Sequence, residues 1–222
     1  MGKHEAGYAR VARDLYPTRE RWVIEALLAH IQLAGVIWEP AAGRGDLVTV
    51  LRDSGARVVA SDITNHGFPL DTMLDFTTGQ VPPAPFEIIV TNPPGGPRNT
   101  TAEAFIATGL KHLTHGVSLL ALLLPVDFDS AGGRRRLFAD CPWFAAKIVL
   151  TRRIVWFPRT DGVRAAPKEN HAWFVWQRTA LKTRTPDRMP DLPGVAGGID
   201  GDPPFLGARS DVAFEHRIAN VP

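Results

Sequence analysis

Asn92-Pro93-Pro94-Gly95 combines a side-chain amide with two consecutive prolines. Proline fixes its own φ angle and restricts the preceding residue, so the pair predicts a rigid, extended turn. We expect the Asn92 side-chain oxygen and the Pro93 carbonyl to converge on one point, where they can accept hydrogens from a planar amino group. That arrangement would orient the nitrogen lone pair toward an electrophile and stabilise its developing positive charge. Taken alone, the tetrapeptide favours an ordinary Pro-Pro turn, and only the segment from Glu39 to Gly45 upstream favours the catalytic interpretation.

A second candidate site begins at Glu39, directly after a short apolar run, and ends at Asp46. Gly43 and Gly45 allow a tight turn and a close approach of backbone to ligand, although a bare pair of glycines also fits a plain turn. Acids at the two ends of the turn repel phosphate but suit an ammonium or a sulfonium. The segment therefore favours S-adenosyl-L-methionine over NAD or ATP. The residues expected to contact it here are Glu39, Ala41, Gly43, Gly45 and Asp46.

Two further acids follow later in the chain. Asp62 ends a predicted strand, where an acid in this kind of fold accepts hydrogen bonds from ribose hydroxyls, and Ile63 beside it is included in the binding set. Asp75 is placed to accept the adenine amino group while Phe76 packs on the purine face. The alternatives are a turn-forming aspartate at position 62 and a loop aspartate beside a core phenylalanine at positions 75 and 76.

These segments together resemble the class I S-adenosylmethionine-dependent amino-methyltransferases with an Asn-Pro-Pro motif. The closest likeness is to small adenine-N6 DNA methyltransferases of phage and restriction type, over residues 16–178. Tyr16-Pro17-Thr18 resembles the N-terminal segment that closes over the methionine moiety, which implies that these three residues bind the cofactor. The resemblance implies methyl transfer to an exocyclic amino nitrogen, with adenine N6 in DNA as the acceptor. It makes Asn92, Pro93 and Pro94 catalytic, with Asn92 also at the cofactor.

The chain departs from this family at Gly95, where members carry an aromatic residue that stacks on the extruded base. Such stacking contributes about 1 to 3 kcal/mol. Phe128, Trp156 and Phe157 could replace it or could be core residues. An RNA base or a protein glutamine amide therefore remains an alternative acceptor, as does a catalytically weak, cofactor-binding subunit of a larger complex.

In place of the family's usual recognition domain, the sequence offers only the loop 157–170 and the tail. We expect cations of this loop to hold the acceptor, and sequence selectivity either to be modest or to come from a separate recognition partner. Three cations in this loop and the glycine after the prolines are the predicted substrate contacts. They are Arg159, Arg164, Lys168 and Gly95.

Alternating strand and helix patterns position these residues. They predict an α/β fold, Rossmann-like and doubly wound, whose mostly parallel sheet has an antiparallel edge strand near 171–178. Residues 1–178 would form the catalytic domain, and 179–222 a Pro/Gly-rich irregular tail. The predicted helices are 19–31 with Thr18 as N-cap, 46–51, 101–113 and 134–139, and the predicted strands are 35–39, 57–62, 86–90, 117–124, 147–151 (extended, in the longest version, to 157) and 171–178.

The length and composition of the chain limit the classes of protein to which it can belong. The chain has 222 residues, 45% of them hydrophobic, which suits one domain with a full core. No apolar run is long enough for a membrane helix, and no signal peptide is recognised at the N-terminus, so a cytoplasmic location without a membrane partner is expected. One cysteine excludes an intramolecular disulfide, and the histidine spacing predicts no metal site. The net charge of +2 is too small to indicate nucleic-acid binding, although arginines cluster at 134–136 and 152–153.

Overall fold

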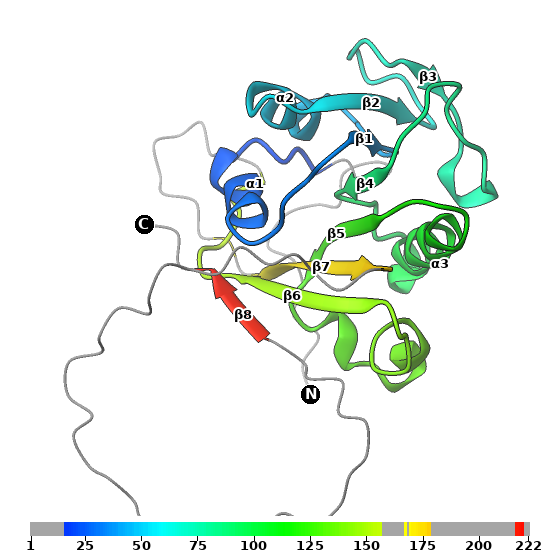
Figure 1. The fold of residues 1–222 in the computed structure, drawn as a ribbon. Coiled ribbons are helices and arrows are strands. Elements are labelled where there is room, and N and C mark those ends of the chain that lie inside the picture. The colour runs from blue at the N-terminus through cyan, green and yellow to red at the C-terminus, as the bar shows by residue number, and fades with distance from the viewer. Residues whose placement is uncertain (1–15, 157–166, 168, 179–215, 220–222) are drawn as a thin grey trace, which may run out of the picture.

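The computed structural model describes residues 16–156, 167, 169–178 and 216–219. Its strands form one sheet in the order β3-β2-β1-β4-β5-β7-β6-β8 (Figure 1). The strands are β1 (Val36–Glu39), β2 (Arg57–Asp62), β3 (Thr72–Met73), β4 (Ile88–Thr91), β5 (Leu119–Pro125), β6 (Phe144–Leu150), β7 (His171–Gln177) and β8 (His216–Ala219). The α-helices are α1 (Arg21–Leu28), α2 (Asp46–Asp53) and α3 (Thr100–Thr114), and the short 3-10 helices are η2 (Phe76–Thr78), η3 (Pro97–Asn99), η4 (Phe128–Ser130) and η5 (Gly132–Leu137).

Helices cover both faces of this sheet, with α1 and α2 on one face and α3 on the other (Figure 1). Successive residues of a strand point to opposite faces, and the core divides accordingly. Ile37 of β1 packs with α1 and α2, whereas its neighbour Trp38 packs with α3. Burial on both faces explains why β5 is an unbroken apolar run rather than an alternating one. The prediction of a doubly wound α/β fold is confirmed.

The antiparallel strand predicted near 171–178 is β7, which runs opposite to both of its neighbours. It lies between β5 and β6 near one side of the sheet, rather than forming the rim itself. The reason is its composition, because residues 171–176 are all buried and an outermost strand would leave many of these aromatic side chains exposed. Beyond it, β6 and β8 pair in parallel. β8 falls within the segment expected to be an irregular tail, and the other residues after 178 lie outside the described part of the chain.

Several boundaries differ from the sequence prediction. Thr18 is not a helix cap, because α1 begins at Arg21 and Glu20 is its N-cap residue. The Thr18 hydroxyl instead accepts a hydrogen bond from Asn92, 74 residues later in the chain. The predicted helix 134–139 is a 3-10 helix, and β6 ends at Leu150 instead of continuing toward 157. No helix in the described ranges is long and apolar enough to cross a membrane.

Gly45 lies at the N-terminus of α2 with φ +78°, and a Cβ there would be 2.1 Å from the Phe68 ring. Gly55, after the same helix, has φ +91° and open space around it. Gly55→Ala should cost about 1 to 2 kcal/mol of unfolding free energy, the cost of a left-handed alanine. Gly45→Ala should cost about 1 to 3 kcal/mol more, because Phe68 must move. Urea unfolding measures both variants. The contact with Phe68 would be contradicted if both variants lost the same unfolding free energy. It would also be contradicted if Gly45→Ala still cost more than Gly55→Ala when Phe68 is replaced by alanine.

Candidate active site

A cavity of about 250 Å3 opens at the carboxyl ends of β1, β2 and β4. Glu39 and Asp62 are the last residues of β1 and β2, and Asn92 follows β4 directly. Parallel strands that neighbour one another bring their carboxyl ends to one edge of the sheet, and open α/β folds bind ligands there. Residues far apart in sequence therefore meet in a single pocket.

Most of the residues predicted to bind the cofactor or to act in catalysis line this cavity. They are Tyr16, Pro17, Thr18, Glu39, Ala41, Gly43, Asp46, Asp62, Ile63, Asp75, Phe76, Asn92 and Pro94. Gly45, Pro93 and Gly95 are not part of the lining, because Gly45 faces Phe68 and Gly95 leads away into α3. The predicted acceptor contacts Arg159, Arg164 and Lys168 lie outside the described residues, as does Phe157.

Glu39 is fully buried at the end of β1 and is only half satisfied. Its Oε1 accepts hydrogen bonds from the Thr91 hydroxyl at 2.6 Å and from the Ala41 backbone N–H at 3.0 Å. Its Oε2 has no hydrogen-bond partner among the described residues. Burial raises the pKa of Glu39 to about 8, against the lowering effect of these two hydrogen bonds. A cation placed at Oε2 would both satisfy this atom and favour the charged carboxylate.

Asp62 joins β2 to the turn after β1. Its Oδ2 accepts the Gly43 N–H at 2.9 Å, and its Oδ1 accepts the Thr64 N–H at 2.9 Å. His66 lies nearby, with Nε2 4.0 Å from Oδ1. Each carboxylate oxygen can accept a second hydrogen bond, so Asp62 can brace the glycine turn and still receive hydroxyl donors from the cavity.

Asp75 and Phe76 have structural roles as well as positions on the cavity wall. Asp75 caps η2, because its Oδ1 accepts hydrogen bonds from the backbone N–H and the hydroxyl of Thr77. Phe76 is buried in an aromatic cluster, 5.0 Å between ring centroids from Trp38 and 4.9 Å from Phe105. Both alternatives from the sequence, a loop aspartate and a core phenylalanine, therefore hold here, and both residues also face the cavity.

The Asn92 amide is held in one orientation. Its Nδ2 donates to the Tyr16 backbone carbonyl and to the Thr18 hydroxyl, each at 3.1 Å. A backbone carbonyl can only accept a hydrogen bond, so Tyr16 requires the nitrogen of the amide to face it. The Asn92 Oδ1 is left as an acceptor that no described residue uses. The predicted catalytic residue is thus preset to receive an N–H donor.

The glycines after the two prolines build a turn into α3. The Gly95 carbonyl accepts N–H groups of Thr101 and Ala102 at the start of that helix. Gly96 has φ +69°, and a Cβ there would be 2.0 Å from the Thr101 hydroxyl, so this position requires glycine. Phe128 is a core residue, and Trp156 packs between Tyr16 and His171 with only 6% of its surface exposed. Within the described part of the chain, the missing aromatic platform is therefore not replaced by either ring.

Several cavity residues were not among those predicted from the sequence. Arg44 stands within the glycine turn, is exposed, and forms no ion pair with a described acid. Phe105 reaches the cavity from α3 and reads in sequence as one apolar helix residue among many. The wall also includes Pro40, Ala42, Leu47, His66, Leu74, Thr77 and Thr101. Arg44 could have been found from its place between the two glycines.

Most arginines of the two clusters contact other residues of the chain, although all but Arg134 are exposed. Arg134 bonds Glu103 at 2.8 Å, and its guanidinium carbon lies 3.9 Å from the centroid of the Phe128 ring. Arg135 pairs with Asp140 at 2.8 Å, and Arg153 donates to the Asn170 side chain at 2.9 Å. Within the 134–136 cluster, Arg135 and Arg136 are exposed, and Arg135 is the one of the two that forms an ion pair with a described residue, Asp140.

No family model matches the chain, and no curated protein matches it. Solved structures resemble it partially. A precorrin-6Y C5,15-methyltransferase from Geobacter metallireducens is 16% identical, with 77% of this chain and 94% of that chain covered and a TM-score of 0.45. A dimethyladenosine transferase from Plasmodium falciparum is 13% identical, with 70% and 60% covered and a TM-score of 0.44. The glycopeptide N-methyltransferase MtfA, complexed with S-adenosyl-L-homocysteine, is 16% identical, with 71% and 89% covered and a TM-score of 0.43. At this level of likeness, function has to be inferred from the residues of the site.

The raised pKa of Glu39 predicts a specific pH dependence of stability. Its ordinary value is 4.5 and its folded value about 8, so between these pH values the folded state holds a proton that the unfolded state has lost. The Glu39 contribution to the unfolding free energy therefore falls as pH rises from about 5 to about 8. Urea unfolding across this range should show that fall in the wild type relative to Glu39→Gln.

The difference in unfolding free energy between the wild type and Glu39→Gln isolates the contribution of Glu39. Both proteins retain His171, whose pKa is lowered by burial to about 4 and which therefore affects both alike. Glu25→Gln, at an exposed glutamate, is the matched control and should run parallel to the wild type. If Glu39→Gln also runs parallel, Glu39 is not protonated in the folded state over this range.

Proposed function

We propose that this protein transfers a methyl group from S-adenosyl-L-methionine to an exocyclic amino nitrogen, and that the cavity beside β1, β2 and β4 holds the cofactor. The observation that carries the proposal is the Asn92 amide. Its nitrogen donates to Tyr16 and Thr18, while its oxygen accepts no hydrogen bond from a described residue. The same cavity wall contains the half-satisfied Glu39 carboxylate. An acceptor for an amino group and an acid for a cation therefore lie in one pocket.

The residues present fit S-adenosyl-L-methionine. Its ammonium would satisfy Glu39 Oε2, and its carboxylate would suit Arg44 on the same turn, two groups without a partner among the residues that the structure describes. Asp62 has acceptor capacity left for ribose hydroxyls. Ile63 is 61% exposed yet lines the cavity, which suits a side chain that an adenine ring would cover, with Phe76 on the wall as well. The cavity walls thus provide acidic, basic and apolar groups that suit the amino-acid, ribose and adenine parts of this cofactor.

When bound, the cofactor supplies an electrophilic methyl group on a sulfonium. The chain supplies orientation and charge stabilisation. Asn92 Oδ1 and the Pro93 carbonyl would accept the two hydrogens of the acceptor amine, which directs its lone pair out of the plane of the ring or amide. The same oxygens stabilise the positive charge that develops on the nitrogen, so no strong base is needed. The extra proton then leaves to solvent.

For the acceptor we propose adenine N6 in DNA. This rests on the resemblance of the Asn-Pro-Pro segment and on the need for a planar amine at Asn92. Selectivity would come from the loop 157–170, with Arg159, Arg164 and Lys168 holding phosphates, and from a separate recognition partner. The glycine at position 95 weakens stacking of an extruded base, and for that reason an RNA base or a glutamine amide is the alternative acceptor.

Substitutions at Asn92 and Asp62 should have opposite effects. Asn92→Ala should lower kcat by about a thousandfold, because it removes a group that stabilises charge in the transition state, while cofactor affinity changes only a few-fold. Asp62→Ala should mainly weaken cofactor binding, since it loses both the ribose acceptor and the brace on Gly43. Isothermal titration with S-adenosyl-L-homocysteine and single-turnover kinetics measure the two effects. Normal cofactor binding by Asp62→Ala would refute the ribose assignment.

The acceptor class can be tested by supplying the purified protein with tritiated cofactor and, separately, unmethylated DNA, RNA or cell protein. We expect the label in DNA, at adenine N6 after nucleoside analysis. Label in RNA or protein would replace the DNA proposal and leave methyl transfer intact. If the cofactor raises the melting temperature but nothing is labelled, the chain is a cofactor-binding subunit that needs its partner.

A further inference from the structure

The orientation of Asn92 depends on the segment 16–18, and that segment has its own anchor. Its Pro17 carbonyl accepts the Arg19 N–H at 3.0 Å, and Arg19 forms an ion pair with Asp46 at 3.4 Å. These contacts tie the segment to the cofactor turn. Neither of them fixes the Tyr16 carbonyl that meets Asn92, so the other neighbours of Tyr16 matter.

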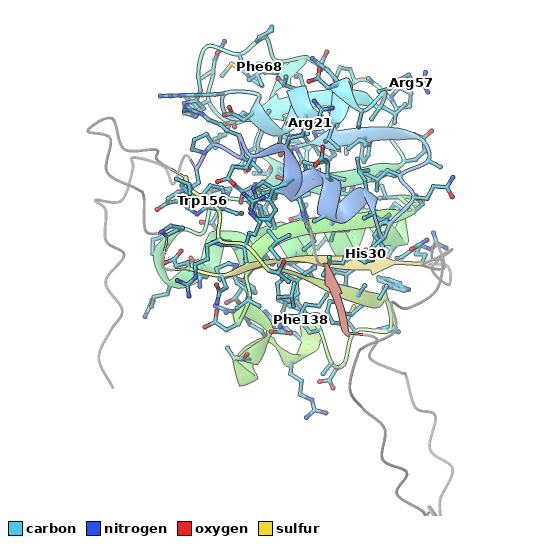
Figure 2. The ribbon with its side chains drawn as sticks, turned by 90° about the vertical axis from the view of Figure 1, so that its left-hand side faces the viewer. Arg21, His30, Arg57, Phe68, Phe138 and Trp156 are labelled. Carbon is cyan, nitrogen blue, oxygen red and sulfur yellow. The ribbon has the colours of Figure 1, made fainter. Side chains whose placement is uncertain are left out.

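One of those neighbours is Trp156, in the segment 154–156 after β6. The Trp156 ring meets Tyr16 edge-on at 5.7 Å between ring centroids and meets His171 at 5.1 Å on its other side. Figure 2 shows Trp156 beside the chain that leads into α1. Ile154 and Trp156 are buried although the segment is neither helix nor strand. Residues 154–156 therefore form a packed support for the segment that holds Asn92.

Glu20 links the segment 16–20 to residues 154–156 through a hydrogen bond of its carboxylate. Its Oε1 accepts the backbone N–H of Val155 at 2.5 Å, and its Oε2 accepts the indole N–H of Trp22. The Trp22 ring has a second contact, because the guanidinium carbon of Arg152 lies 4.9 Å from its centroid. Glu20 does not line the cavity, so it can touch neither cofactor nor acceptor there. One carboxylate thus joins the start of α1 to the chain that leads into the predicted acceptor loop.

We propose that Glu20 is a positioning residue for the reaction: by fixing residues 154–156 against the segment 16–20, it holds the Tyr16 carbonyl where it sets the Asn92 amide. The Asn92 amide can adopt two orientations, which exchange the positions of its nitrogen and its oxygen. The Thr18 hydroxyl can either donate or accept, so it fits both orientations, and only the Tyr16 carbonyl distinguishes them. A displaced carbonyl would let the amide rotate by half a turn and present N–H groups to the amine. Two donors would then face each other.

The inference rests on the proposed function for its kinetic consequence, but its structural part can be tested without cofactor or acceptor. In the uniformly 15N-labelled full chain, the Asn92 side-chain signals are identified by their loss in Asn92→Asp. In Glu20→Ala, hydrogen exchange at this side chain should accelerate about tenfold, as expected for loss of one hydrogen bond. Glu20→Gln keeps the volume of the side chain but only one acceptor oxygen, and should show the same effect more weakly. Glu25→Gln, on the same helix, is the matched control and should match the wild type.

The kinetic readout separates positioning from general damage. Glu20→Ala should lower kcat for methyl transfer about tenfold, and Glu20→Gln should lower it less. The KM values for cofactor and acceptor should stay within about twofold in both, since the change acts on the amide alone. If the Val155 amide signal shows loss of its bond to Glu20 while the Asn92 signals remain unchanged, the proposal is overturned. If the wild type transfers no methyl group, the proposed function fails, and the Asn92 signals still decide the positioning role.

Discussion

A carboxylate buried at the end of β1 constrains the rest of the site. Glu39 is removed from water, uses one oxygen for two hydrogen bonds and leaves the other without a described partner. Such a group must hold a proton or receive a cation, because an isolated buried charge is strongly unfavourable. Thr91 and Ala41 fix the position of the engaged oxygen, one from the neighbouring strand β4 and one from the turn. The ligand chemistry of the cavity follows from this one unsatisfied atom.

Local chemistry could be predicted from the sequence because it depends on neighbours in the chain. The turn from Glu39 to Asp46 combines acids and glycines within a few residues, and its place at a strand end follows from the apolar run before it. The alternation of strands and helices likewise predicts the two covered faces. Sequence patterning does not encode which strands pair across the sheet, so the interior position of β7 was missed.

Long-range partners were also beyond the sequence. Thr18 has the residue type of a helix cap, and it stands before an amphipathic run, so capping was the natural expectation. Its hydroxyl is used instead by Asn92, a partner that only the folded chain brings near. Phe105 reaches the cavity for the same reason, through the packing of α3. The need for glycine at position 96 also depends on the folded structure, because the turn there lies close against Thr101.

The placement of β7 between β5 and β6 has an architectural consequence. Because β6 and β7 are antiparallel neighbours, their connection, residues 151–170, begins and ends at the edge of the sheet that carries the cavity. The free energy of closing a loop rises only slowly with its length. An insertion in this connection would therefore cost little free energy and leave β1, β2 and β4 unaltered. Chain added in this connection would reach the mouth of the cavity without altering the strand ends that carry Glu39 and Asp62.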